Sequence, residues 1–341
     1  LAAYYKSLTL RASIDPLIGM IFDAAPPSAA TAGGGDDESA LAALTPDPAT
    51  LGSNAWAIGP DRTADGTTML VGNPHFPWQG ALRFYEVHLT VPGEIDVYGA
   101  SLLGSPAVNI GFNENVAWSH TVSAGTRFTA YTLDLLDGDP TSYHYDDETR
   151  EMTSETVAIE VLDPDTGDIE IVEHTVWFSH YGPVLAFPGL GWTDDVVISI
   201  RDANAENDEI IPQFLDMNLA GSMDEFIAAH AEHQGIPWVN TIAASADGRI
   251  WYADTSATPN LSPEAIAAWE TALDTDPFTQ IAFDNRVFLL DGSDSLFEWV
   301  DDPGARDPGV VPFSAMPQLE RTDFLFNAND PNWIANPAEP I

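Results

Sequence analysis

The stretch that decides the fold of this chain reads Leu51-Gly52-Ser53-Asn54-Ala55-Trp56 and continues, after a turn, with Val71-Gly72-Asn73-Pro74-His75-Phe76-Pro77-Trp78. A strand is predicted over Ser53–Gly59, and Pro60–Gly66 is typical of a hairpin turn. Thr67–Val71 is the predicted return strand. Such a hairpin would hold Ser53 at a strand end, where a sheet fixes its position.

Ser53 is the candidate nucleophile of this stretch. A serine hydroxyl is a weak nucleophile until a base removes its proton. If the chain cleaves itself between Gly52 and Ser53, the new α-amine supplies that base, since its usual pKa of about 7.7–8.0 leaves much of it neutral near neutral pH. Gly52 suits the bond to be broken, because it has no Cβ to hinder attack on its carbonyl. Taken alone, Gly-Ser-Asn is more typical of a turn that enters a strand.

The chain from Gly52 onward resembles the start of the β chain in the penicillin acylase family, whose members are N-terminal nucleophile (Ntn) hydrolases. It is most similar to the branch of acyl-homoserine-lactone acylases and aculeacin A acylases. The similarity rests on motifs that follow one another along the chain: Gly52–Gly59, Gly72–Gly80, Arg83–Leu89, Ala107–Phe112, Trp118–Val122, Gln234–Thr241 and Phe326–Asp330. Residues 1–51 match only loosely.

The resemblance implies a fold class and a division of the chain. The implied fold is α+β, a four-layer αββα Ntn-hydrolase sandwich, present here in part. Residues 1–23 would be the helical end of an α-chain-like segment, and residues 24–52, rich in Pro, Ala and Gly, a linker or propeptide. Residues 53–341 would be the N-terminal part of the β chain. We expect this chain to be a fragment of a longer precursor. An arginine that members of the family use near the active site would then lie beyond Ile341.

The resemblance also implies the catalytic residues. Ser53 would be the nucleophile, and His75 would lie beside it, orienting the amine and assisting self-cleavage. The tetrahedral oxyanion needs two fixed donors, each worth roughly 3–4 kcal/mol. The matching donors are the backbone N–H of Val122 and the side-chain amide of Asn329. Asn327 is the alternative to Asn329, two residues earlier in the same motif.

An apolar pocket for an acyl chain is expected next to the nucleophile. Phe76, Trp238 and Val239 match lining positions of the family. Leu102 and Phe214 are weaker candidates, and an ordinary core position is an equally good interpretation of both. Each buried methylene of an acyl chain would gain about 0.8 kcal/mol in such a pocket.

Neither of two possible metal sites is favoured. The penicillin G branch holds calcium through carboxylates shortly after the oxyanion strand, but Gly125–Thr129 contains none. Asp163–Asp168 has the spacing of a calcium loop, yet it lies between two strand-like segments and lacks the terminal glutamate. We interpret it as a hairpin turn, with metal binding as the alternative, and we expect no cofactor.

The charge balance is extreme, with 53 acidic and 11 basic residues, a net charge of −42, and Lys6 as the only lysine. Nucleic acid is disfavoured as a partner, because phosphate binding needs clustered Lys and Arg. The acids are scattered through aromatic, strand-like sequence, which argues against a disordered acidic tail. A salt-adapted surface is the better hypothesis, since salt screens the repulsion between carboxylates. Cysteine is absent, which excludes disulfides.

Periodicity predicts the remaining elements. Helical patterns cover Leu1–Phe22, interrupted at Pro16, and a short one covers Ser39–Leu44. Further helices are predicted over Pro212–Asn218, Met223–Glu232 with Ser222 as its N-cap, and Pro263–Leu273. Strands are predicted over Leu82–Val91, Ile95–Leu103, Val116–Val122, Phe128–Leu136, Val157–Leu162, Ile169–Phe178, Val196–Arg201, Val239–Ala244 and Ile250–Ala253. No apolar run is long enough to span a membrane.

The sequence therefore predicts an amidohydrolase that removes an acyl chain through an acyl-enzyme on Ser53. The leading substrates are N-acyl homoserine lactones or lipopeptides. The alternatives are removal of penicillin or cephalosporin side chains, or an unprocessed fragment without catalysis. The expected partners are the acylated substrate and the chain's own α and β pieces. The resemblance implies an extracellular or periplasmic location, although no signal peptide is visible.

Overall fold

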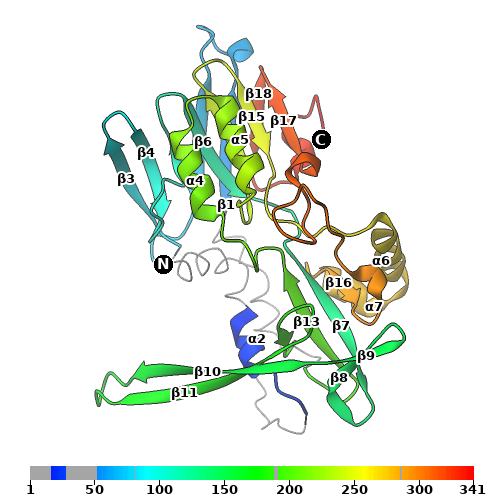
Figure 1. The fold of residues 1–341 in the computed structure, drawn as a ribbon. Coiled ribbons are helices and arrows are strands. Elements are labelled where there is room, and N and C mark those ends of the chain that lie inside the picture. Colours follow the sequence, from blue (N-terminus) through cyan, green and yellow to red (C-terminus); the bar gives the residue numbers. More distant parts are fainter. Residues whose placement is uncertain (1–16, 28–51, 81, 188–190, 285) are drawn as a thin grey trace.

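The computed structural model describes residues 17–27, 52–80, 82–187, 191–284 and 286–341. Most of the predicted helix over Leu1–Phe22, the Ser39–Leu44 helix and nearly all of the predicted linker lie outside these residues. Within them, strands form sheets of three, seven, six and two strands. Figure 1 shows the first two sheets with α4 and α5 in the upper half of the molecule, and the other two in the lower half.

The three-stranded sheet contains the predicted hairpin. β1 (Gly52–Ile58) pairs antiparallel with β2 (Met69–His75) on one side and with β18 (Phe324–Asn327) on the other. A short 3-10 helix, Pro60–Arg62, begins the turn between β1 and β2. The hairpin is confirmed, but β2 runs four residues beyond the predicted end at Val71, so that His75 lies within the strand, opposite Gly52.

The seven-stranded sheet is antiparallel throughout and follows the order β17-β15-β14-β6-β5-β4-β3. Its strands are β3 (Phe84–Val91), β4 (Ile95–Leu102), β5 (Ile110–Phe112), β6 (Val116–Val122), β14 (Val239–Ser245), β15 (Ile250–Ala253) and β17 (Gln318–Arg321). β6 and β14 are buried almost throughout, because they lie in the centre of the sheet and are covered on both faces.

Two cores cover the two faces of this sheet. On one face, Trp118 of β6 packs against Phe226 of α5 (Met223–His233), beside α4 (Ile210–Leu219). On the other face, small and apolar side chains join it to β1 and β18: Ala55, Ala57, Ile242, Ala244, Ile250, Tyr252, Leu319 and Leu325. The described residues thus contain three of the four expected layers: helices, a sheet and a second sheet.

The helix α5 begins as predicted. The hydroxyl of Ser222 accepts a hydrogen bond from the backbone N–H of Glu225 at 3.2 Å, and the Glu225 carboxylate accepts the N–H of Gly221 at 2.7 Å. Both bonds satisfy backbone N–H groups that a helix start leaves free. Because α5 is held at this end, its apolar face stays packed on β6.

The six-stranded sheet has a core of its own. It follows the order β12-β13-β7-β8-β9, with β16 parallel to β7. α2 (Ile18–Asp23) packs with Ile198 and Leu289, whereas Trp269 of α6 (Pro263–Thr275) packs with Tyr131 and Leu133. The bounds are β7 (Phe128–Leu136), β8 (Asp139–Tyr145), β9 (Glu148–Glu151), β12 (Val184–Leu185), β13 (Val196–Asp202), β16 (Leu289–Asp291) and α7 (Pro277–Asp284).

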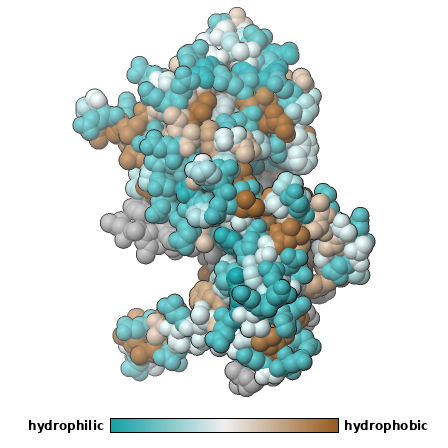
Figure 2. Space-filling model, turned by 45° about the vertical axis from the view of Figure 1, so that its right-hand side comes forward, coloured by the Kyte–Doolittle hydropathy of each residue, from teal (hydrophilic) through white to brown (hydrophobic). Residues whose placement is uncertain are grey.

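A two-stranded ribbon, β10 (Thr153–Leu162) with β11 (Ile169–Phe178), extends from the lower half (Figure 1). Its turn is the predicted one, since Asp163 Oδ1 accepts the backbone N–H groups of Asp165 and Thr166. The strand ends beside this turn are apolar, since Leu162 and Ile169 are 64% and 63% exposed, whereas the turn itself carries three aspartates. Figure 2 shows brown atoms at the end of this ribbon, among several brown areas on the visible face.

Three further 3-10 helices occupy connections: Ser295–Phe297, Phe313–Ala315 and Asn332–Ile334. Among the residues described, no helix combines the length and apolar character needed to cross a membrane.

Candidate active site

Ser53 lies at the start of β1, between the two facing sheets, and only 2% of it is exposed. Its hydroxyl donates to the carbonyl oxygen of Gly52 at 2.5 Å, directly beside the Gly52–Ser53 peptide bond. The chain is uncut here, so Ser53 N is a peptide N–H. It donates to the side-chain oxygen Oδ1 of Asn329 at 3.0 Å.

Asn329 links Ser53 to the end of β6. It follows β18, the neighbour of β1, and its backbone φ of +68° is a left-handed conformation that asparagine tolerates better than most residues. Its Oδ1 also accepts the backbone N–H of Val122 at 2.9 Å, and its Nδ2 donates to the carbonyl of Ser53 at 3.0 Å. The structure thus brings the predicted nucleophile and both predicted oxyanion donors together.

Asn327, the alternative to Asn329, makes no hydrogen bond to Ser53; its partners within the described part of the chain are other residues. It is 1% exposed, and its Oδ1 accepts the Thr121 hydroxyl at 2.6 Å and the backbone N–H of Asn329 at 2.8 Å. Its Nδ2 donates to the carbonyl of Asp330 at 2.9 Å. Asn327 therefore holds the turn that aims Asn329, and the geometry favours Asn329 as the group that meets Ser53.

Glycines allow the two sheets to approach at this point. A Cβ on Gly72 of β2 would lie 2.6 Å from Ser119 Oγ of β6, closer than side chains tolerate. A Cβ on Gly52 would lie 3.3 Å from Asn329 Nδ2. Packing therefore favours glycine at position 72, whereas at position 52 a small shift of the Asn329 amide would make room for a Cβ.

His75 is placed near the nucleophile by the sheet register. Its backbone is opposite Gly52, and Ser53 is opposite Pro74. The residue is exposed, and its ring makes no hydrogen bond to any residue in the described part of the chain. A role for His75 in orienting the amine or assisting cleavage stays a prediction.

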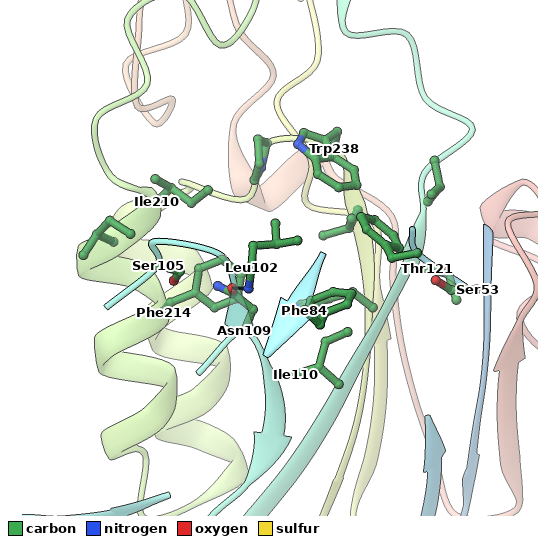
Figure 3. A pocket seen from close by; sticks show the side chains of 16 residues that line it. Ser53, Phe84, Leu102, Ser105, Asn109, Ile110, Thr121, Ile210, Phe214 and Trp238 are labelled. Carbon is green, nitrogen blue, oxygen red and sulfur yellow. Dashed lines mark hydrogen bonds between the residues drawn. The ribbon is translucent and has the colours of Figure 1, made fainter. Parts of the chain in front are cut away.

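A single pocket next to Ser53 contains all five predicted acyl-pocket residues: Phe76, Leu102, Phe214, Trp238 and Val239. It lies between the seven-stranded sheet and the start of α4, with Ser53 at one side and Ile210 and Phe214 at the other (Figure 3). The Phe76 and Trp238 rings stack with centroids 5.9 Å apart. As far as the structure describes it, the lining contains no acid, lysine or arginine, which suits an uncharged aliphatic or aromatic group.

The sequence analysis gave no site role to two polar residues of this lining, Asn109 and His120, although both lie within the motifs Ala107–Phe112 and Trp118–Val122. A signal was available in the alternation of β6, since His120 is two residues before Val122 and therefore projects from the same face. Burial lowers the pKa of His120 to about 4, while hydrogen bonding to the carbonyls of Asn240 and Asn109 raises it in part. The ring is therefore neutral near pH 7.

The segment Gly125–Thr129, which follows the strand that ends at Val122, contains an arginine, Arg127. Arg127 is largely buried; burial lowers its pKa, and the nearby carboxylates of Asp202 and Asp254 raise it. Within the described residues there is no group of three or more His, Cys, Asp or Glu side chains that could hold a metal ion.

Comparisons with known proteins point to one family. A family model described as penicillin amidase matches residues 12–340. Acyl-homoserine lactone acylase PvdQ of Pseudomonas putida is 41% identical over 304 residues, which are 89% of this chain and 38% of that protein. Aculeacin-A acylase of Actinoplanes utahensis is 41% identical over 301 residues, covering 88% of this chain and 37% of that protein.

A solved structure also resembles the chain. Thermostable penicillin G acylase from Alcaligenes faecalis matches with a TM-score of 0.63 at 22% identity, over 82% of this chain and 44% of that one. The likeness confirms the predicted α+β Ntn-hydrolase fold. The chain belongs to the penicillin amidase family, as its motifs predicted. It spans about 38% of the length of the PvdQ relative.

Proposed function

We propose that this chain is the nucleophile-bearing part of an acylase that hydrolyses the amide between an acyl chain and an amine. The observation that carries the proposal is one hydrogen-bonded group, in which Asn329 joins Ser53 to Val122. Ser53 and Val122 also line the apolar pocket. Nucleophile, oxyanion donors and acyl site would then lie within one small volume, as acyl transfer requires.

Self-cleavage would come first. The Ser53 hydroxyl, which donates to the Gly52 carbonyl oxygen at 2.5 Å, lies beside the group whose carbon it would attack. The peptide bond would become an ester, the nitrogen of Ser53 would become a free amine, and water would hydrolyse the ester to release the Gly52 carboxylate. His75, opposite Gly52 in β2, would assist this step.

Turnover would use the freed residue. The Ser53 amine would take the hydroxyl proton as Oγ attacks the substrate carbonyl, and would return it to the departing amine. In the uncut chain Val122 N–H donates to Asn329 Oδ1. Rotation of the Asn329 amide would turn Nδ2 toward the same point, so that Nδ2 and Val122 N–H would both donate to the oxyanion. Water would then hydrolyse the acyl-enzyme.

The relatives' names suggest the substrate class. Acyl-homoserine lactones and aculeacin A both appear in the names of relatives about 41% identical to this chain. The largely apolar lining, with Phe214 and Val239, supports an acyl chain as the bound group. Residues 1–23 would be the end of the α piece, 24–52 the linker and 53–341 the start of the β piece. An extracellular or periplasmic location remains part of this proposal.

Mass spectrometry and a substrate panel test the function. The purified chain should yield a species that begins at Ser53 and should release amine from N-acyl homoserine lactones or lipopeptides faster than from penicillin G. Ser53→Ala should abolish both. Ser119→Ala is the matched control, because Ser119 is also buried and its hydroxyl has no partner among the described residues. A chain that stays whole, or Ser53→Ala that retains hydrolysis, would overturn the mechanism.

A further inference from the structure

Besides the hydroxyl residues Ser53, Ser105 and Thr121, the lining of the acyl pocket contains two larger polar side chains, Asn109 and His120. Both residues line the pocket, and they are 7% and 5% exposed. β5 and β6 pair antiparallel with Gly111 opposite Trp118, and continuing this register places Asn109 opposite His120. Residues directly opposite each other project from the same face of a sheet, so the two side chains are neighbours.

His120 presents a hydrogen-bond acceptor without a donor. Its Nδ1 lies 3.0 Å from the carbonyl oxygen of Asn240 and 3.3 Å from the hydroxyl oxygen of Thr241. The carbonyl, the nearer of the two, can only accept, so Nδ1 carries the ring proton, and the pKa of about 4 keeps the ring neutral. Nε2 is then a lone pair, and it is buried without a partner among the described residues. The nearby Asn109 carbonyl already accepts Trp118 Nε1–H at 2.7 Å and cannot donate to it.

Asn109 presents the complementary donor. Its Oδ1 accepts the backbone N–H of Leu102 at 2.9 Å, which fixes the orientation of the amide. Its Nδ2 donates to no residue that the structure describes. Asn109 and His120 therefore offer one donor and one acceptor within a largely apolar lining.

A hydroxyl group matches this pair, because it donates one hydrogen and accepts another. A ketone oxygen would meet Asn109 but leave His120 Nε2 without a donor, and a plain methylene would leave both unmet. Resting on the proposed function, we propose that the pocket selects acyl chains that carry a hydroxyl part-way along, held between Asn109 Nδ2 and His120 Nε2. Pockets that hydrogen-bond a hydroxyl discriminate against analogues that lack it.

Binding to the Ser53→Ala variant tests this selectivity without requiring cleavage or turnover. Calorimetry would compare a saturated fatty acid with its monohydroxylated isomers of the same length. One isomer should bind roughly tenfold more tightly than the plain acid, the worth of about one hydrogen bond. In His120→Asn this preference should vanish, since asparagine can keep the donor toward the Asn240 carbonyl but lacks an atom at Nε2.

Two further variants guard the result. Asn109→Asp can still accept from Leu102 N–H but loses the Nδ2 donor, so it should also lose the preference. Ile210→Ala, a change in the apolar lining, should weaken both acids by the same factor. Equal binding of all isomers, or the same preference in His120→Asn, would mean that Asn109 and His120 hold only water. Either result would overturn the proposed hydroxyl selectivity and leave the proposed function standing. Failure of every acid to bind would overturn the proposed acyl pocket as well.

Discussion

Replacement of Asn329 by glycine would remove an amide that joins three buried groups. Its Oδ1 accepts the N–H groups of Ser53 and Val122, and its Nδ2 donates to the Ser53 carbonyl, all at 2.9–3.0 Å. Each such bond contributes about 1 kcal/mol, so Asn329→Gly should lower the free energy of unfolding by about 3 kcal/mol. Glycine adopts the left-handed φ of +68° without strain, so the backbone adds at most the entropic cost of glycine, about 1 kcal/mol, which the control below measures.

Two other substitutions separate the contributions of backbone, acceptor and donor. Asn329→Ala loses the same bonds and adds a left-handed alanine, which costs roughly 1–2 kcal/mol more. Asn329→Asp keeps an acceptor for the Ser53 and Val122 N–H groups, so it should be more stable than Asn329→Gly. It has no side-chain donor for the oxyanion, and turnover should fall by about 10²–10³-fold.

Urea unfolding would be measured in the Ser53→Ala background, where self-cleavage cannot change the chain, and hydrolysis would be measured with Ser53 intact. Asn73→Gly is the control, because Asn73 is exposed on the neighbouring strand β2. That change should cost no more than about 1 kcal/mol. Stability and turnover close to wild type in Asn329→Gly would refute the role assigned to this amide.

Three further predictions concern the exposed His75, the buried His120 and the charged surface. His75→Ala should slow appearance of the species that begins at Ser53, followed by mass spectrometry, yet change unfolding by less than about 0.5 kcal/mol, since His75 is exposed; unchanged cleavage kinetics would contradict this. Burial lowers the pKa of His120 in the folded chain to about 4, so between about pH 6.5 and 4 the unfolded chain binds a proton that the folded chain does not. The free energy of unfolding should therefore fall as the pH is lowered through this range. His120→Asn should flatten this pH dependence in urea titrations, and an unchanged dependence would contradict the assignment to His120. With a net charge of −42, the thermal midpoint should rise between dilute buffer and molar KCl; equal midpoints would defeat the salt-adapted surface.

The sequence predicted the local parts of the site well. The hairpin that carries Ser53 and the strand that ends at Val122 agree with the structure, because each rests on a short segment with its own turn or strand signals. The preference for Asn329 over Asn327 came from the family resemblance; Asn329 is the one that contacts Ser53, and its role as oxyanion donor stays a prediction. Leu102 and Phe214, the weaker candidates, also line the pocket.

Long-range pairing was harder to predict. The position of His75 opposite Gly52 depends on how far β2 continues, and the turn-like residues Gly72-Asn73-Pro74 lie inside the strand instead of after it. The strand β18, which brings Asn329 to Ser53, pairs with β1 across more than 260 residues of sequence. His120 was missed because a histidine in a buried strand looks like any core position until the register shows which side chain faces it.

The proposed catalysis requires that an acyl group becomes attached to Ser53 itself. The decisive measurement mixes the enzyme with an N-acyl homoserine lactone, stops the reaction with acid and maps the peptide masses. We expect a peptide whose first residue is Ser53 and whose mass is increased by that of the acyl group. An acyl group found on another residue, or a Ser53 peptide still joined to Gly52 in an enzyme that hydrolyses the substrate, would contradict it.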